Sequence, residues 1–310
     1  MNIVFMGTPD FAVPCLETLI KNNCNVRGVI TQPDKPIGRS GKLTYPPIKE
    51  FALKFNLKVY QPEKVKNSEF IETLKKINPD LIVVVAFGQI LPLEILNIPK
   101  LGCINVHASL LPKYRGAAPI QWSIINGEKI TGVSTMFMDK GMDTGDIILT
   151  KEIEIGDSET SEELFEKLSK LGAEALIETI QQIQSGNAKG IKQDNNIATY
   201  APMLNKEDGN INWELYAIEI KNFIRGMYPW PGSYTFYKGN RMKIFDVEII
   251  DKNTDAQPGT IIDVDKNSIY VQTGNGIIKI NQIQFDGSKR MCVKDYFLGH
   301  SIDRGNILSS

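Results

Sequence analysis

The stretch DLIVVVAF at residues 80–87, which is continuously apolar from residue 81 to residue 87, constrains the fold of this chain more than any other. Its β-branched residues show no polar alternation, which is typical of a strand buried on both faces of a parallel sheet. Residues 2–6 form a similar strand pattern that ends at Gly7, and a helical pattern then leads to the apolar residues 26–30. This order of strand, helix and strand predicts an α/β fold with a doubly wound, mostly parallel sheet.

Further strands and helices extend this pattern along the chain. CINVH at residues 103–107 is predicted to be a short strand, and AAPIQWSIING at 117–127 a helix. The segments 132–138 and 146–155 are predicted to be an adjacent pair of strands. Residues 161–184 carry apolar side chains at helical spacing, which predicts a long amphipathic helix.

The composition changes after this helix. Residues 186–205 are polar and include GNAKGIKQDNN, which is typical of a linker. After one further helix around residues 213–225, short strands separated by turn signals predict a small β-barrel or sandwich. We therefore expect two domains in this chain of 310 residues, at 1–188 and 206–310, joined by a linker at 189–205.

Charge, cysteine spacing and the lengths of apolar runs give no sign of a nucleic-acid-binding, metal-binding, secreted or membrane-spanning protein. The net charge of -1 gives no global argument for a nucleic-acid partner, so any such contact has to be local. The four cysteines show no paired metal or redox spacing, and we interpret them as the reduced thiols of a cytoplasmic protein. The first residues lack the features of a signal peptide. The longest apolar run, at 81–87, is too short to span a bilayer, so we expect no membrane association.

Gly7 follows the first predicted strand and precedes a helix, where backbone amides can bind an anion. A dinucleotide-binding fingerprint requires three spaced glycines, and only Gly7 is present. We therefore interpret this stretch as a tight turn and expect no nucleotide cofactor.

His107 is one of only two histidines in the chain, and its neighbours give it a chemical context. Asn105 precedes it by two residues on the same predicted strand, so both side chains point to the same side. In such a sheet, ligands bind beyond the carboxyl ends of the strands. An imidazole that moves a proton and an amide that stabilises an oxyanion suit acyl transfer. Asp143, in GMDTGD, can orient the imidazole.

Simpler interpretations of these residues stay open. A lone histidine at a strand end is often only a hydrogen-bonded structural residue, and Asp143 is equally an ordinary turn aspartate. Ser109 offers a nucleophile, but no GxSxG elbow surrounds it, so we favour direct transfer without a covalent enzyme intermediate. We expect no metal, because the second histidine, His300, lies in the other predicted domain.

Several motifs together resemble the methionyl-tRNA formyltransferases. They are NVHASLLPKYRGAAPIQ with DTGDII, the opening MGTPDFAVPCLETL, and the later KEDGNINW and YPWPGSYT. The resemblance covers nearly the whole chain, and the SLLP block is highly specific for folate-dependent formyl transfer. It implies a Rossmann-like catalytic domain and a carboxyl-terminal OB-like β-barrel. The implied reaction moves a formyl group from 10-formyltetrahydrofolate to the α-amino group of methionine on initiator tRNA.

The resemblance also assigns roles to residues. It implies that Asn105 polarises the formyl oxygen and holds the oxyanion. It further implies that His107, supported by Asp143, moves the proton from the attacking amine to the departing folate nitrogen. On their pattern alone, the apolar residues of SLLP and AFGQILP are more typical of a core. The folate-binding residues that the resemblance implies are Ser109, Leu110, Leu111, Pro112, Phe87 and Ile90.

The family's inserted loop, which is thought to reach the tRNA acceptor end, corresponds to QPDKPIGRSGKLTYPPIK. Between residues 33 and 49 it carries four basic residues against one acid, a local charge of +3. The resemblance implies that Lys35, Arg39 and Lys42 contact the tRNA. The domain at 206–310 has 13 basic and 13 acidic residues, so a positive face for RNA needs segregation of these charges. We expect a monomer.

Three other functions stay open on the sequence. A formyltransferase acting on a small amine, such as a glycinamide ribonucleotide or an amino sugar, would not need the inserted loop and the second domain. A formyl-folate hydrolase would use the same site with water as the acceptor. A non-catalytic RNA-binding protein would not require Asn105, His107 and Asp143 together.

Overall fold

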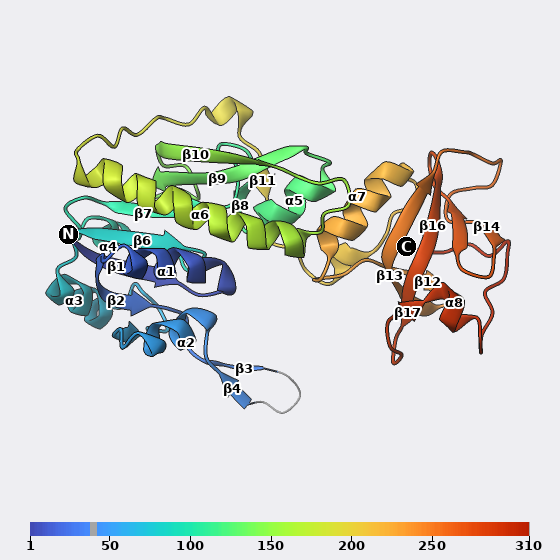
Figure 1. The fold of residues 1–310 in the computed structure, drawn as a ribbon, viewed down its shortest axis with the longest axis horizontal. Coiled ribbons are helices and arrows are strands. Elements are labelled where there is room, and N and C mark those ends of the chain that lie inside the picture. The colour runs from blue at the N-terminus through green and yellow to red at the C-terminus, as the bar shows by residue number, and fades with distance from the viewer. Residues whose placement is uncertain (38–41, 310) are drawn as a thin grey trace. The chain divides into compact units, whose positions relative to one another are not determined.

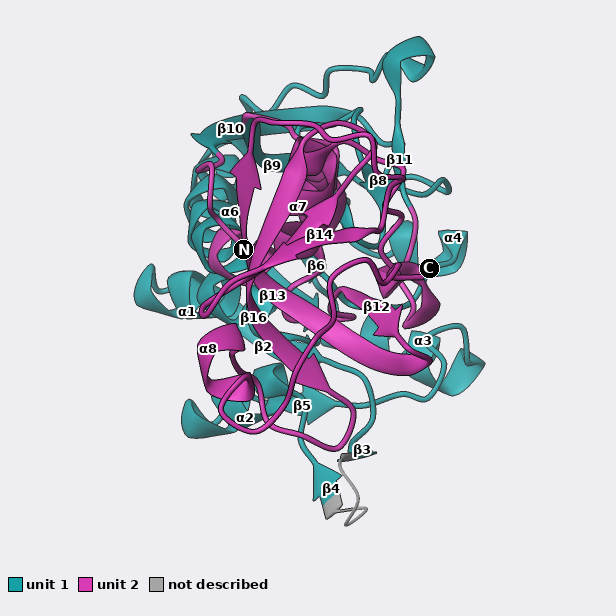
Figure 2. Ribbon diagram, turned by 90° about the vertical axis from the view of Figure 1, so that its right-hand side faces the viewer, with its two compact units in different colours: residues 1–119, 130–154, 165–201 teal, residues 120–129, 155–164, 202–310 magenta. Residues whose placement is uncertain are grey.

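The computed structural model of the chain describes residues 1–37 and 42–309. The chain divides into two compact units (Figure 2). The predicted domain boundaries around residues 189–205 stay a prediction. The first unit contains Met1–Pro119, Ile130–Glu154 and Phe165–Ala201, and the second contains Ile120–Lys129, Ile155–Leu164 and Pro202–Ser310.

The first unit is built around a seven-stranded sheet (Figure 1). Its strands are β1 (Asn2–Gly7), β2 (Asn25–Ile30), β5 (Val59–Tyr60), β6 (Leu81–Val85), β7 (Cys103–His107), β9 (Ile130–Phe137) and β10 (Ile147–Glu154). The strand order is β10-β9-β7-β6-β1-β2-β5. The five strands from β7 to β5 run parallel to one another. β9 pairs antiparallel with both of its neighbours, β7 and β10. Every residue of β6 is buried, as its apolar run predicts. The predicted doubly wound, mostly parallel sheet is confirmed.

Helices cover both faces of this sheet. The helices of the first unit are η1 (Asp10–Ala12), α1 (Val13–Lys21), α2 (Pro47–Lys54), α3 (Ser68–Ile77), α4 (Leu93–Leu96), α6 (Ser161–Gln184) from Phe165 onward, and η2 (Asn195–Ile197). Nearly all of α5 (Pro119–Ile125) belongs to the second unit. On one face, Val4 of β1 and Phe70 of α3 belong to the same buried cluster. On the other face, Gly172 lets α6 approach the sheet closely. A Cβ atom at Gly172 would lie 3.1 Å from Val106 of β7 and 3.9 Å from Cys15 of α1.

The carboxyl ends of the parallel strands meet at one edge of the sheet. Here β1 ends at Gly7, β6 at Val85 and β7 at His107. The register places Val84 of β6 opposite Asn105 of β7. Because ligands of such sheets bind beyond the carboxyl ends of the strands, this edge is where the candidate site is expected.

The second unit contains an antiparallel sheet with the strands β12 (Tyr234–Tyr237), β13 (Asn240–Ile250), β14 (Ile261–Val264), β15 (Ile269–Gln272), β16 (Ile277–Phe285) and β17 (Met291–Cys292). Its remaining helices are η3 (Glu207–Gly209), α7 (Ala217–Met227) and α8 (Val293–Tyr296). The strand order is β12-β13-β16-β15-β14, with β17 beside β16. Within the residues that the structure describes, this sheet does not close into the expected barrel. Residues 307–309 instead pair near the two edges of the sheet. Ser309 bridges Phe236 of the edge strand β12, and Ile307 bridges Thr260, which directly precedes the edge strand β14.

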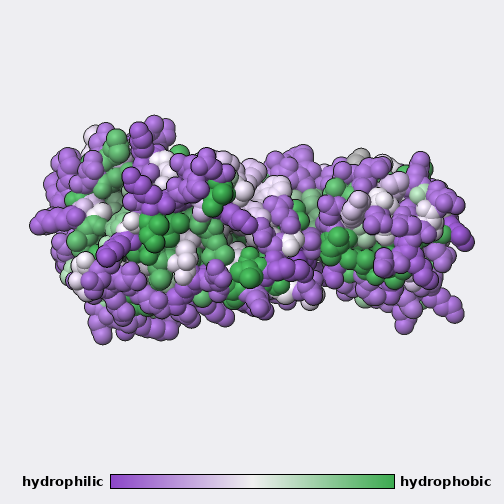
Figure 3. Space-filling model, turned by 90° about the horizontal axis from the view of Figure 1, so that it is seen from above, coloured by the Kyte–Doolittle hydropathy of each residue, from purple (hydrophilic) through white to green (hydrophobic). Residues whose placement is uncertain are grey.

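The face of the molecule that Figure 3 shows is mainly hydrophilic, with smaller hydrophobic patches between the polar side chains. In the described part of the chain, no helix has the length and hydropathy needed to cross a membrane. All four cysteines are free, and burial raises the pKa of the Cys15 and Cys103 thiols to about 12. These two thiols are therefore protonated at neutral pH.

Candidate active site

Asn105 and His107 lie at the carboxyl end of β7, two residues apart and on the same side of the strand. His107 is only 7% exposed, and its Nε2 lies 2.9 Å from the carbonyl oxygen of Tyr114. A carbonyl oxygen only accepts hydrogen bonds, so Nε2 carries the hydrogen in this contact. Nδ1 is then the ring nitrogen that can accept a further proton.

Asp143 reaches the same place from the loop between β9 and β10. Its Oδ2 lies 3.7 Å from His107 Nδ1 and accepts a hydrogen bond of 2.9 Å from the backbone N–H of Gly116. Its Oδ1 lies 3.4 Å from Asn105 Nδ2. The φ angle of Asp143 is 55°, a left-handed conformation that is uncommon outside glycine and is often found at functional sites. The structure thus brings the three expected catalytic side chains together.

The loop after β7 is held by its own hydrogen bonds. The Ser109 hydroxyl donates to the carbonyl oxygen of Lys113 at 2.6 Å, and the Ser134 hydroxyl of β9 donates to the carbonyl oxygen of Ser109 at 2.7 Å. The N–H of Leu111 donates to Ser134 Oγ at 3.0 Å. Ser109 is completely buried, so its hydroxyl supports the loop and is not exposed as a nucleophile.

The apolar side chains of this loop are only partly accessible. Leu110 packs against β9 at Gly132, where an added Cβ atom would lie 2.6 Å from Leu110 Cδ2. Leu111 is buried, whereas Leu110 and Pro112 are half-buried. The peptide bond between Leu111 and Pro112 is cis. The loop therefore offers part of its apolar surface to a ligand.

The second expected folate-binding segment is divided between core and surface. Phe87 is 2% exposed and belongs to the buried cluster beneath α3. Its carbonyl oxygen accepts hydrogen bonds from Thr8 Oγ1 at 2.9 Å and from Gln32 Nε2 at 3.1 Å. Ile90 is 78% exposed. In this structure Ile90 offers its side chain to a ligand, and Phe87 does not.

The expected tRNA-binding loop includes a short hairpin, formed by β3 (Lys35–Ile37) and β4 (Lys42–Thr44). Lys35 is exposed at the start of the first strand, and Lys42 begins the second. Arg39 lies outside the described residues.

The base of this loop is anchored by Asp34. Its carboxylate accepts a hydrogen bond from Gln61 Nε2 at 2.7 Å and forms an ion pair of 2.7 Å with Lys49 Nζ. The hydrogen bond from Gln61 contributes most to a lowered pKa of Asp34, and the contact with Lys49 lowers that pKa further. Because Lys49 is paired, the excess positive charge of the loop belongs to Lys35, Arg39 and Lys42.

Two polar side chains that the sequence analysis did not single out also reach this site. Gln193 Nε2 donates to the carbonyl oxygens of Asp143 at 2.8 Å and Gly145 at 2.7 Å. Arg115 is 2% exposed and donates to Gln193 Oε1 from Nε at 3.0 Å and from Nη2 at 2.7 Å. Arg115 lies within a motif of the resemblance, whereas Gln193 lies in the predicted linker, where no local signal marks it.

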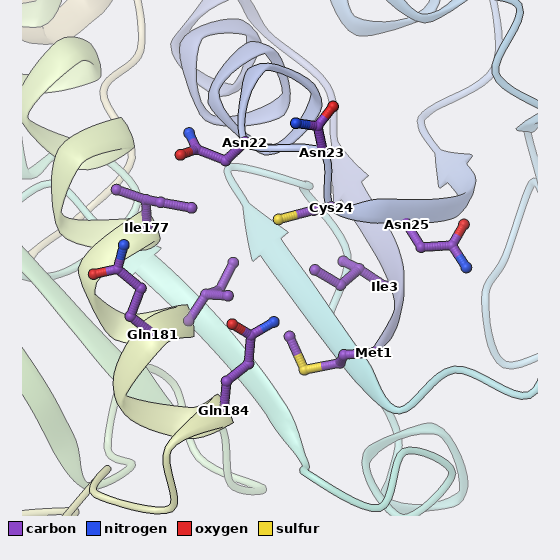
Figure 4. A pocket seen from close by; sticks show the side chains of 10 residues that line it. Met1, Ile3, Asn22, Asn23, Cys24, Asn25, Ile177, Gln181 and Gln184 are labelled. Carbon is purple, nitrogen blue, oxygen red and sulfur yellow. The ribbon is translucent and has the colours of Figure 1, made fainter.

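Two cavities lie away from these side chains. One, of about 230 Å³, opens at the amino ends of β1 and β2, the opposite edge of the sheet from His107. Figure 4 shows amide side chains around it, among them Asn22 and Gln181. The other, of about 410 Å³, follows β5 beside Gln61 and Phe70. Among the described residues, no three histidine, cysteine, aspartate or glutamate side chains are grouped to hold a metal ion.

Both the sequence and the fold of this chain have matches among known proteins. Residues 1–180 match the formyl transferases, and residues 203–301 match the C-terminal domain of formyl transferases. The chain therefore belongs to the formyl transferase family.

Relatives of known function place the chain more narrowly within that family. It is 52% identical over 309 residues to the methionyl-tRNA formyltransferase of Acetivibrio thermocellus, and 54% identical over 308 residues to that of Alkaliphilus oremlandii. Each match covers 99% of this chain and 99% of the relative. Within the formyl transferases, the chain groups with the methionyl-tRNA formyltransferases.

Solved structures share the fold at lower identity. The sugar 3N-formyl transferase WlaRD, crystallised in the presence of dTDP and 5-N-formyl-THF, has a TM-score of 0.68 at 24% identity. An N-formyltransferase from Helicobacter canadensis, in complex with folinic acid and dTDP-3-aminofucose, has a TM-score of 0.66 at 20% identity. Each match covers 93% of this chain and 99% of the other. These likenesses show the fold alone.

Proposed function

We propose that this chain transfers a formyl group from 10-formyltetrahydrofolate to the α-amino group of methionine carried by initiator tRNA. The observation that carries the proposal is the meeting of Asn105, His107 and Asp143 at the carboxyl edge of the parallel sheet. The choice of acceptor is supported by the similarity to methionyl-tRNA formyltransferases over 99% of the chain.

Asn105 binds the formyl oxygen through Nδ2. Its contact with Asp143 Oδ1, at 3.4 Å, is long for a hydrogen bond, so the amide can turn to a better acceptor. When the amine attacks the formyl carbon, the formyl oxygen becomes negatively charged. The N–H donor of Asn105 stabilises that charge more than it stabilises the neutral carbonyl, and this lowers the barrier.

His107 accepts the proton of the attacking amine at Nδ1, because Tyr114 already engages Nε2. The Asp143 carboxylate, 3.7 Å from Nδ1, stabilises the imidazolium that forms. The bond from the formyl carbon to the methionine nitrogen forms, and the bond from that carbon to N10 of the folate breaks. The imidazolium then gives its proton to N10, so the reaction consumes no other reagent.

Substrate contacts follow from the same arrangement. The folate lies beside the loop after β7, and the acceptor tRNA lies beside the positive loop, residues 33–49. The enzyme acts as a monomer in the cytoplasm. In this proposal residues 1–188 carry the catalytic site and 206–310 bind the tRNA, joined by 189–205. The folate contacts are Leu110, Pro112 and Ile90, and the buried residues Ser109, Leu111 and Phe87 support them from the core. The tRNA contacts are Lys35, Arg39 and Lys42.

A transfer assay tests this function. The chain is given 10-formyltetrahydrofolate with a labelled formyl group and, side by side, charged initiator tRNA, free methionine and small amines. Label is expected on the charged tRNA with far higher kcat/KM than on the other acceptors. Preferential labelling of a small amine, or release of labelled formate without transfer, would contradict the proposal.

The positive loop leads to a prediction about salt. A Lys35→Ala/Lys42→Ala double variant is expected to raise KM for charged tRNA, because two contacts to phosphate are lost. The slope of log(kcat/KM) against log salt concentration should become shallower by roughly 1 for each lysine that contacts a phosphate. Lys170→Ala, an exposed lysine of α6, is the matched control. A slope equal to that of the wild type would remove these lysines from the tRNA contact.

A further inference from the structure

Gln193 joins two parts of the first unit through both ends of its side-chain amide. Its Nε2 donates to the carbonyl oxygens of Asp143 and Gly145, on either side of Thr144. Its Oε1 accepts two hydrogen bonds from the guanidinium of Arg115. All the hydrogen-bonding capacity on both sides of the amide is thus used within the protein.

The orientation of this amide is fixed by chemistry. Arg115 has donors only, and the carbonyl oxygens of Asp143 and Gly145 are acceptors only. Turning the amide over would set Nε2 against the guanidinium and Oε1 against the two carbonyl oxygens. The guanidinium is itself held, because Nη2 also donates to Asn195 Oδ1 at 2.9 Å and the side chain is 2% exposed.

The backbone around Arg115 is equally well anchored. β8 (Arg115–Gly116) pairs in parallel with β11 (Tyr200–Ala201), and the N–H of Arg115 donates to the carbonyl oxygen of Thr199 at 2.9 Å. Gly116 leaves no space for a side chain, since a Cβ atom there would lie 2.7 Å from the carbonyl oxygen of Ala201. Gln193 is therefore attached to a rigid part of the fold.

Asp143, by contrast, belongs to a loop whose internal hydrogen bonds gather on Asp139, which accepts from the Gly141 N–H at 2.9 Å and from Thr144 Oγ1 at 2.6 Å. Residues 139–142 are exposed, and Asp143 has the left-handed φ of 55°. The loop is tied to the Arg115 region at the Asp143 carboxylate, by the Gly116 N–H, and at two carbonyl oxygens, by Gln193. Without the Gln193 contacts, the hydrogen bond from the Gly116 N–H to the Asp143 carboxylate would be the remaining link between Asp143 and the Arg115 region.

We propose that Gln193, held in place by Arg115, is a positioning residue that keeps the Asp143 carboxylate directed at His107. The inference deepens the proposed function and rests on it, since the effect is exerted on formyl transfer. Gln193 acts through Asp143 and does not contact the substrates. Loss of the amide should therefore lower kcat and leave the KM values for both substrates nearly unchanged.

The test uses Gln193→Met, which keeps the length of the side chain and removes its hydrogen bonds, and Gln193→Glu, which keeps an acceptor for Arg115 and loses the N–H donors. Both should lower kcat by roughly 10- to 100-fold, as misplacement of a catalytic group does. Lys192→Ala, an exposed neighbour, should match the wild type in kcat. If Gln193→Met does not fold, Gln193→Glu carries the same comparison.

A second measurement separates positioning from a general loss of structure. In an Asp143→Asn background, Gln193→Met should lower kcat by less than about threefold, because coupled residues are not additive. Wild-type kcat in either Gln193 variant, or the same loss of kcat in both backgrounds, would overturn the positioning role. The wild-type chain runs in the same assay. If it fails to formylate charged tRNA, the proposed function is contradicted, whatever the variants do.

Discussion

The His107→Ala variant is expected to lower kcat for formyl transfer to charged initiator tRNA by roughly 10²- to 10⁴-fold, the usual contribution of a general acid and base. The attacking amine must lose a proton as it forms the new bond, and Nδ1 of His107 is the nitrogen left to accept it. Steady-state kinetics with saturating folate and varied tRNA measure the loss.

The same variant should still bind the folate, because the imidazole is 7% exposed and Nε2 is occupied by Tyr114. Calorimetric titration with tetrahydrofolate measures this binding. Loss of folate affinity in proportion to the loss of kcat would indicate a damaged site and not a missing base. Turnover near that of the wild type would remove His107 from the mechanism.

The Asn105→Ala variant is expected to lower kcat by roughly 10²- to 10³-fold, as the removal of one oxyanion donor does. The expected effect on the KM for folate is small, because the amide binds the transition state more strongly than the ground state. Asn105→Asp should be at least as impaired, since it removes the N–H donors and puts a second carboxylate beside Asp143.

Asn22→Ala is the matched control for these variants. Asn22 lies on the exposed surface at the opposite edge of the sheet, and its loss should leave kcat unchanged. If Asn105→Ala raised KM for folate and left kcat as in the wild type, the amide would be a binding group and not an oxyanion donor.

The fold of the first unit is largely predictable because its strands have strong local signals. The apolar run at 81–87 predicts β6, since a strand covered on both faces shows no alternation of polar and apolar residues. The segments 132–138 and 146–155 form β9 and β10 as expected. The closed barrel was not found in the second unit, where the end of the chain pairs with Phe236 and Thr260. Such pairings join residues far apart in sequence, and strand periodicity does not encode them.

The candidate site is predictable only where local spacing determines it. A separation of two residues on a strand places Asn105 and His107 on one side. Phe87 is apolar and suits a core and a ligand wall equally, and the structure puts it in the core. Gln193 stands in a polar segment that resembles a linker, yet it contacts Asp143 across 50 positions and Arg115 across 78. The composition of the segment around Gln193 does not predict these long-range hydrogen bonds.

The central claim is that three polar side chains meet around the formyl carbon. A crystal structure of the chain with a non-transferable analogue of 10-formyltetrahydrofolate bound, its formyl group on N10, tests this most directly. We predict a formyl oxygen about 3 Å from Asn105 Nδ2, with His107 and Asp143 beside it and the pterin along the loop after β7. Folate bound elsewhere, for example in the cavity at the amino ends of β1 and β2, would contradict the account. So would a formyl group turned away from Asn105 and His107.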